Sequence, residues 1–157
     1  MIDAEDIDFQ IGFISEYGDY PPGAKIYIDD VCKFKGLIHE DKEIKFNHRL
    51  NFDAQHCLRI ERYNKECSKP VNGIHQTLVL DKVKIDGIDI QNIIYSRSYN
   101  IPDYPEHWIK QNPGLEKIIL AETHFGFNGS WRLNFNSPFY QFMIDAVSGR
   151  LSNVPIY

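Results

Sequence analysis

Alternation of apolar and polar residues with a period of two is the feature that most constrains the fold of this chain. In segment 7–15 the apolar residues that share one face are Ile7, Phe9, Ile11 and Phe13. Segment 43–52 repeats the pattern with Ile44, Phe46, His48, Leu50 and Phe52. Successive side chains of an extended strand point to opposite faces, so this pattern is typical of half-buried β-strands.

Further stretches of strand length, each bounded by turn residues, complete the expected set of strands. A one-residue phase change at Asp81–Lys82 indicates a β-bulge, and Asp86–Gly87 is a two-residue hairpin signal. A short helix is the alternative for 115–123, where we favour a strand. The other strands are expected at 24–29, 31–38, 56–63, 76–85, 88–96, 131–135 and 139–147.

Together these segments predict one domain over residues 1–157, with a short flexible tail at about 148–157. We expect an all-β fold, an antiparallel β-sandwich or jelly roll with little helix. An aromatic content of 13% supports this expectation, because aromatic residues favour strands.

Charge and hydropathy exclude some classes of partner. The formal charge of −5 and the pI of 5.6 argue against a nucleic-acid partner, which normally selects a basic face. No segment has the character of a signal peptide or the length of a bilayer-spanning run. We therefore expect synthesis in a cytoplasm and no membrane partner.

The three cysteines form no CxxC pair. Cys32 and Cys57 lie in alternating segments, where a reduced and buried thiol is expected. Cys67 lies in a polar loop and is expected to be more exposed, and a Cys57–Cys67 disulfide is the alternative.

The stretch NGSWRLNFNSPFY, at 128–140, predicts a strand that follows a turn and ends at Ser137–Pro138. One face would enter the core with Trp131, Leu133 and Phe135. The opposite face is polar and would either meet solvent or donate hydrogen bonds to sugar hydroxyls; it holds Arg132, Asn134 and Asn136. Asn128 also begins a formal glycosylation sequon.

No recognised catalytic motif is present, and we expect no enzyme and no metal site. The chain lacks G-x-S-x-G, H-E-x-x-H, a P-loop and a dinucleotide fingerprint. A small hydrolase, the alternative, would use Glu106 with His107 or Glu122 with His124. Calcium is the one cofactor left open. Loop 61–73 offers oxygen ligands for it, but few of them are carboxylates.

The segment YNIPDYPEHW, at 99–108, is the predicted ligand-binding site. Aromatic rings stack on the apolar faces of sugars, and carboxylates accept hydroxyl protons. The rings belong to Tyr99, Tyr104 and Trp108, and the carboxylates to Asp103 and Glu106. The surrounding segment 100–114 is expected to be a loop with one helical turn at PEHWIK. Alternatively, the rings cover an edge of the sandwich or lie at a subunit interface.

Three motifs in order resemble calcium-dependent carbohydrate-binding modules that recognise xylan. They are P-x-x-K-I-Y-I-D-D-V (22–31), HCLRIERYNKE (56–66) and HQTLVLDKVKIDGIDIQ (75–91). Lys65 follows Asn64 where those modules carry Asp, and CSKPVNGIHQ replaces their Asp-rich loop. The resemblance therefore implies the β-sandwich and not the calcium site.

A second pattern, KIDGIDIQNIIYS…YPEHW…GFNGSWRLNFNSPFYQFMID (84–145), resembles uncharacterised proteins of tailed phages, including cyanophages. This resemblance implies a small phage-encoded β-sandwich made in the host cytoplasm, either part of the virion or in contact with the host.

The leading hypothesis is therefore a non-enzymatic structural or adhesion module. Its expected partners are other virion proteins of the decoration, tail or baseplate, or a host-surface glycan. Homo-oligomerisation is left open. The first alternative is a stand-alone carbohydrate-binding module that uses the aromatic loop.

Overall fold

The chain folds mainly into strands, and the computed structural model describes residues 3–65 and 73–148. One set of strands consists of β1 (Ala4–Glu16), β4 (Lys42–Asn51), β6 (Thr77–Ile85), β7 (Ile88–Asp89) and β10 (His124–Phe125). The second set consists of β2 (Gly23–Ile28), β3 (Val31–Leu37), β5 (Gln55–Tyr63), β8 (Tyr99–Pro102), β9 (Ile119–Leu120) and β11 (Gly129–Asn136). The helices are α1 (Gln91–Arg97), α2 (Glu106–Gln111) and α3 (Phe139–Val147).

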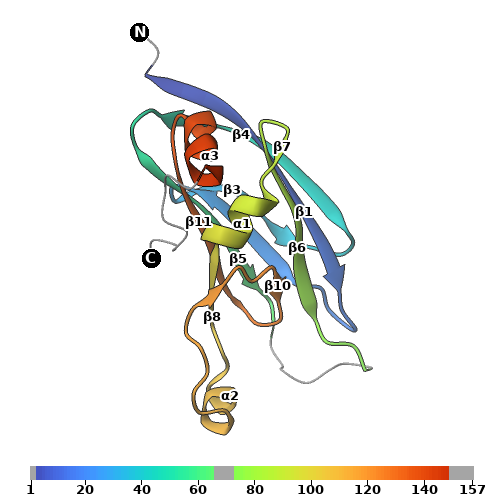
Figure 1. The fold of residues 1–157 in the computed structure, drawn as a ribbon. Helices are drawn as coiled ribbons and strands as arrows, with labels where there is room; N and C mark the ends of the chain where they lie inside the picture. The colour runs from blue at the N-terminus through green and yellow to red at the C-terminus, as the bar shows by residue number, and fades with distance from the viewer. Residues whose placement is uncertain (1–2, 66–72, 149–157) are drawn as a thin grey trace.

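The two sets of strands form two antiparallel sheets that enclose one hydrophobic core (Figure 1). Sheet A has the strand order β10-β6-β1-β4, with β7 paired to β6. Sheet B has the order β3-β2-β5-β11-β8-β9. The predicted all-β sandwich with little helix is confirmed. Apart from Ser148, the predicted tail lies outside the described residues.

The irregularity predicted in the strand at 76–85 is present in sheet A. Gly12 of β1 lies opposite Lys82 of β6. The next residue, Phe13, lies opposite Leu80, so Asp81 has no partner on β1. The β-bulge predicted at Asp81–Lys82 is therefore confirmed, and it allows the apolar residues on both sides of it to face the core.

The predicted hairpin after β6 is also confirmed. Ile85 pairs with Ile88, which leaves Asp86 and Gly87 as the two turn residues. Their φ angles are 51° and 78°, the left-handed conformation that a type I′ turn requires at both positions.

β11 lies in the interior of sheet B and supplies the centre of the core. Trp131, Leu133 and Phe135 are almost completely buried, as their alternation predicted. Phe135 is a packing hub: its ring centroid lies 5.8 Å from that of Phe139 and 6.3 Å from that of Phe9 on sheet A. This side chain therefore links both sheets to α3.

Two segments predicted as strands are helices, and those predictions are wrong. In 88–96 only Ile88–Asp89 is extended; α1 then follows and buries Ile93 and Ile94. In 139–147 the whole segment is helix α3, which buries Phe139 and Phe142. Ile93 and Ile94 lie three and four residues after the buried Ile90, and Phe142 lies three residues after Phe139, so each helix presents one apolar face to the core.

In Figure 1 both helices lie between β11 and β6, where they close one open side of the sandwich. Within the described parts of the chain no helix has the length and apolar character needed to cross a membrane.

Smaller differences concern short strands and a cysteine. The strand favoured for 115–123 is reduced to Ile119–Leu120, and the short strand β10 was not among the expected strands. Cys32 is exposed and not buried, because β3 is an edge strand of sheet B. Cys57 is free and half-buried, whereas Cys67 and its predicted exposure lie outside the described residues.

Replacing Phe135 tests its role as a packing hub. Phe135→Ala is expected to lower the free energy of unfolding by about 3–5 kcal/mol, because it removes a buried ring and leaves a cavity. Urea denaturation followed by circular dichroism measures this change. Tyr95 is 70% exposed, and Tyr95→Ala is expected to change stability by less than about 0.5 kcal/mol. Equal losses in the two variants would contradict the assignment.

Candidate functional site

The predicted ligand-binding segment projects from one end of the sandwich. The chain leaves sheet B after β8, forms α2 and returns at β9 (Figure 1). We call residues 103–118 the projection. The helical turn predicted at PEHWIK is confirmed: Pro105 precedes α2, and the amides of Trp108 and Ile109 both donate to its carbonyl. α2 buries none of its own residues, so this end is largely solvent-exposed.

The base of the projection is fixed by a close backbone approach. Gly129 of β11 lies opposite Pro102 of β8. A Cβ atom at Gly129 would come within 2.6 Å of the Ile101 carbonyl oxygen, so only glycine fits without displacing β8. Beside it, the amide of Asp103 donates a 2.6 Å hydrogen bond to the Asn128 carbonyl oxygen. The turn dipeptide Asn-Gly is therefore also the anchor of the projection.

The Asn128 side chain holds a polar network under this anchor. Its Oδ1 accepts hydrogen bonds from the Lys65 amide, at 2.9 Å, and from Arg62 Nη1, at 3.1 Å. Its Nδ2 donates to the Lys65 carbonyl oxygen. Arg62 also donates from Nη2 to the Gln76 side chain, at 2.7 Å. The side-chain amide of Asn128, the first residue of the formal sequon, therefore joins β11 to the end of β5 through Arg62 and Lys65.

Arg62 is buried, and its hydrogen-bond acceptors are neutral amide groups and backbone oxygens. Burial lowers the pKa of its guanidinium to about 10, because the low-dielectric interior disfavours the charged form. Neutral acceptors offset only part of the free-energy cost of burying this charge. Each hydrogen bond in the network therefore helps to stabilise the charged guanidinium in the interior.

Two rings of the predicted site pack on a residue that the sequence did not identify. The Tyr104 ring meets the Phe127 ring edge-on at 5.0 Å, and the Trp108 ring lies 5.6 Å from it. On the same ring, Lys65 Nζ lies 5.4 Å from the centroid. The only signal for Phe127 in the sequence is its position as an aromatic residue directly before Asn-Gly.

Tyr104 is fixed further by its hydroxyl. It donates a 3.1 Å hydrogen bond to the Glu116 carbonyl oxygen, which ties the two arms of the projection together. Burial raises the pKa of the Tyr104 phenol, with smaller contributions from the carboxylates of Glu116 and Glu122.

The remaining predicted site residues are not gathered around one ligand. Tyr99 is only 2% exposed, so the expectation that its ring is presented in an exposed loop is wrong; β8 pairs with both β11 and β9 at this residue. Asp103 and Glu106 are exposed. Glu106 forms an ion pair with Lys110 one helical turn later, at 3.3 Å.

Beside these residues the projection forms an apolar cleft of about 500 Å³. Ile109 projects at its rim with 53% of its surface exposed. The apolar walls are provided by Ile101, Pro102, Tyr104, Ile109, Pro113 and Leu115. Such a surface favours contact with another apolar surface over hydrogen bonding to hydroxyl groups.

Both carboxylates named for the hydrolase alternative have partners other than the imidazole expected for them. Glu122 Oε1 accepts a 2.9 Å hydrogen bond from the His124 backbone amide, not from its imidazole. Glu106 is engaged by Lys110 as described. In 3–65 and 73–148, no group of three or more His, Cys, Asp and Glu is arranged to hold a metal ion.

Comparisons with known proteins give no family for this chain. No family model matches it, and no significant match is found among curated proteins or solved structures.

Removing the Asn128 side chain tests the anchor of the projection. Asn128→Ala is expected to lower the free energy of unfolding by about 1–3 kcal/mol, because it leaves the Lys65 amide and one Arg62 donor without an acceptor. Chemical denaturation measures the loss. Asn92→Ala, at an exposed position on α1, serves as the control and is expected to be close to neutral. An unchanged stability for Asn128→Ala would mean that the network contributes nothing.

Tryptophan fluorescence reports on the ring cluster. Phe127→Ala is expected to shift part of the emission to longer wavelength and to raise quenching by acrylamide, since Trp108 loses its packing partner while Trp131 remains buried. The additional variant Trp108→Phe should abolish the shifted component. A red shift that survives in the Phe127→Ala/Trp108→Phe protein would come from Trp131 and would contradict the assignment.

Proposed function

We propose that this chain is a non-enzymatic docking and adhesion module that attaches to a larger assembly through its projection. The observation that carries the proposal is the apolar cleft with Ile109 exposed at its rim, on a segment whose base is fixed by Gly129 and Asn128. A rigid apolar surface that extends beyond the core loses little entropy on binding and gains free energy from burial.

A protein partner suits this end better than a glycan. The cleft walls are mainly aliphatic and proline side chains, which match the apolar core of a protein–protein interface. A sugar-binding platform would need flat, accessible rings. Tyr99 is buried, and Tyr104 and Trp108, although partly exposed, both pack against Phe127 and so do not present free flat faces.

The proposed assembly is a phage virion. This part of the proposal is supported by the resemblance of 84–145 to tailed-phage proteins and by the form of the molecule, a small sandwich with a projecting apolar end. The partner would be another protein of the decoration, tail or baseplate.

Site-specific photo-crosslinking in the infected host tests the proposal. A photoreactive amino acid placed at Ile109 is expected to link the chain to a structural protein of gradient-purified particles, identified by mass spectrometry. The same group at Glu43, exposed on β4 of sheet A, should give no such product. Ile109→Asp is expected to remove the chain from particles at unchanged thermal stability. A chain absent from purified particles, or equal crosslinking from Glu43, would overturn the proposal.

A further inference from the structure

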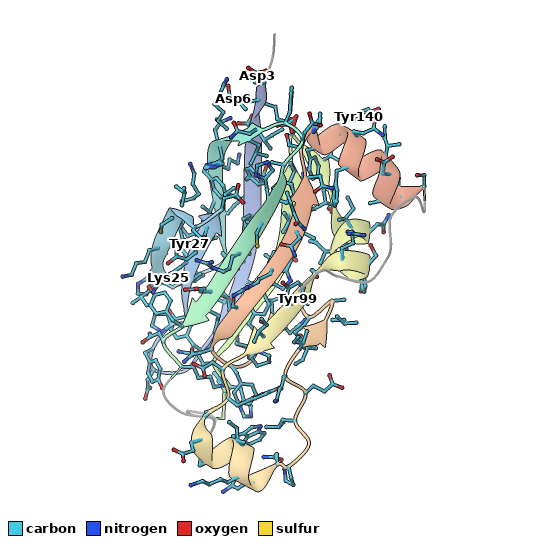
Figure 2. All side chains as sticks on the ribbon, turned by 90° about the vertical axis from the view of Figure 1, so that its left-hand side faces the viewer. Asp3, Asp6, Lys25, Tyr27, Tyr99 and Tyr140 are labelled. Carbon is cyan, nitrogen blue, oxygen red and sulfur yellow. The ribbon has the colours of Figure 1, made fainter. Side chains whose placement is uncertain are left out.

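A second cleft, of about 390 Å³, lies beside α3. In Figure 1, α3 lies at the end of the molecule opposite the projection. Figure 2 marks this end by Tyr140 on α3, at the top of the view. The cleft is formed by the turn between β4 and β5, the end of β11 and the first turns of α3. The polar residues that line it are Asp53, Gln55, Asn136, Ser137, Gln141 and Asp145.

Backbone hydrogen bonds join the two loops that form this cleft. The Asp53 amide donates to the Ser137 carbonyl oxygen at 2.9 Å, and the Ser137 amide donates to the Ala54 carbonyl oxygen at 3.3 Å. β5 and β11 also end in register here, because Gln55 lies opposite Asn136. The cleft wall is therefore held by the same sheet that holds the core.

Ser137 carries an unsatisfied hydroxyl at this cleft. The residue is 3% exposed, and its Oγ is buried with no hydrogen-bond partner in the described structure. Buried hydroxyls are nearly always bonded, so an unpaired one in a cleft wall points to a group that is supplied from outside. Binding through Oγ would require a staggered rotamer that turns this hydroxyl toward the cleft.

The other lining groups define the chemistry of that ligand. Asp53 and Asp145 offer carboxylate acceptors, while the amides of Gln55, Asn136 and Gln141 both donate and accept. Gln141 Nε2 donates to Asp145 Oδ1 at 3.0 Å, which orients that carboxylate across the helix. Mixed donors and acceptors of this kind match the hydroxyl groups of a saccharide.

Other ligands fit this cleft less well. No lysine or arginine lines it, which disfavours an anion. Its lining contains two carboxylates, and no group of three possible metal ligands occurs within residues 3–65 and 73–148, which disfavours a cation. Phe142 also lies in the lining, but its ring is buried against Phe135 and Phe139, so the contacts to a sugar would come from the polar groups.

We propose that the cleft between the β4–β5 turn and α3 binds a neutral saccharide, with Asp53 and Ser137 as its hydrogen-bonding partners. The polar row predicted on β11 leads into this site, since Asn134 and Asn136 lie on one face of the strand at successive alternate positions. The inference is independent of the docking function assigned to the projection, and either can fail alone.

Titration of the ¹⁵N-labelled full chain with D-glucose, D-galactose, D-mannose and N-acetyl-D-glucosamine, followed by NMR, tests the proposal. At least one sugar is expected to shift the amide signals of Ser137 and Gln141 in a saturable way. Asp53→Asn should weaken that binding at least about tenfold, because it removes a charged acceptor but keeps a residue that tolerates the φ of 55° at this turn. Ser137→Ala should also weaken it.

Ile109→Asp, at the other end, is the matched control and should bind the sugar as the unmodified chain does. Folding of each variant is checked by the dispersion of the same spectra. Three results would overturn the proposal: no saturable shift with any of the four sugars, binding unchanged in both Asp53→Asn and Ser137→Ala, or the same amide shifts produced by calcium chloride alone.

Discussion

The pairing of β11 with β5 is the constraint on which the rest of the structure depends. Their register runs without interruption from Gly129 opposite Arg62 to Asn136 opposite Gln55. A slip of one residue would turn Trp131, Leu133 and Phe135 to solvent and bring the polar row into the core, so the burial of three large side chains holds this register in place. At its first residue the strand anchors the projection, and directly after its last residue lies Ser137 of the opposite cleft.

Period-two alternation was sufficient to predict the sandwich because burial of one face of each strand is a local property of the sequence. The bulge at Asp81 was predictable for the same reason, since a phase change in a continuous strand needs an extra residue. The helices α1 and α3 were not predicted. Both segments are short, and adjacent apolar pairs such as Ile93–Ile94 and Phe139–Tyr140 do not distinguish the helical period from the strand period. The choice between helix and strand is decided by tertiary packing, because each helix closes an open side of the sandwich.

The candidate site likewise combines features that the local sequence predicts with features that depend on contacts between distant residues. Segment 99–108 was predicted as a binding site because of its composition; residues 103–108 do project from the fold, whereas 99–102 form β8 within sheet B. The burial of Tyr99 depends on strand neighbours that are distant in sequence, and the role of Phe127 depends on how two loops meet. Neither relation leaves a pattern in a single sequence. The opposite cleft, built from residues more than eighty positions apart, gave no sequence signal beyond the polar row on β11.

The two ends of the molecule therefore differ in chemistry in a way that suits two different contacts. The projection is apolar at its cleft and fixed at its base, so its burial against a protein is favourable and needs little ordering. The cleft beside α3 is lined mainly by polar groups, and a ligand there must replace the hydrogen bonds these groups would make to water, which favours weak but selective binding. A module attached by the first end would display the second toward solvent. If the proposed attachment brings several copies of the module together, weak binding at each cleft would add up to firmer adhesion.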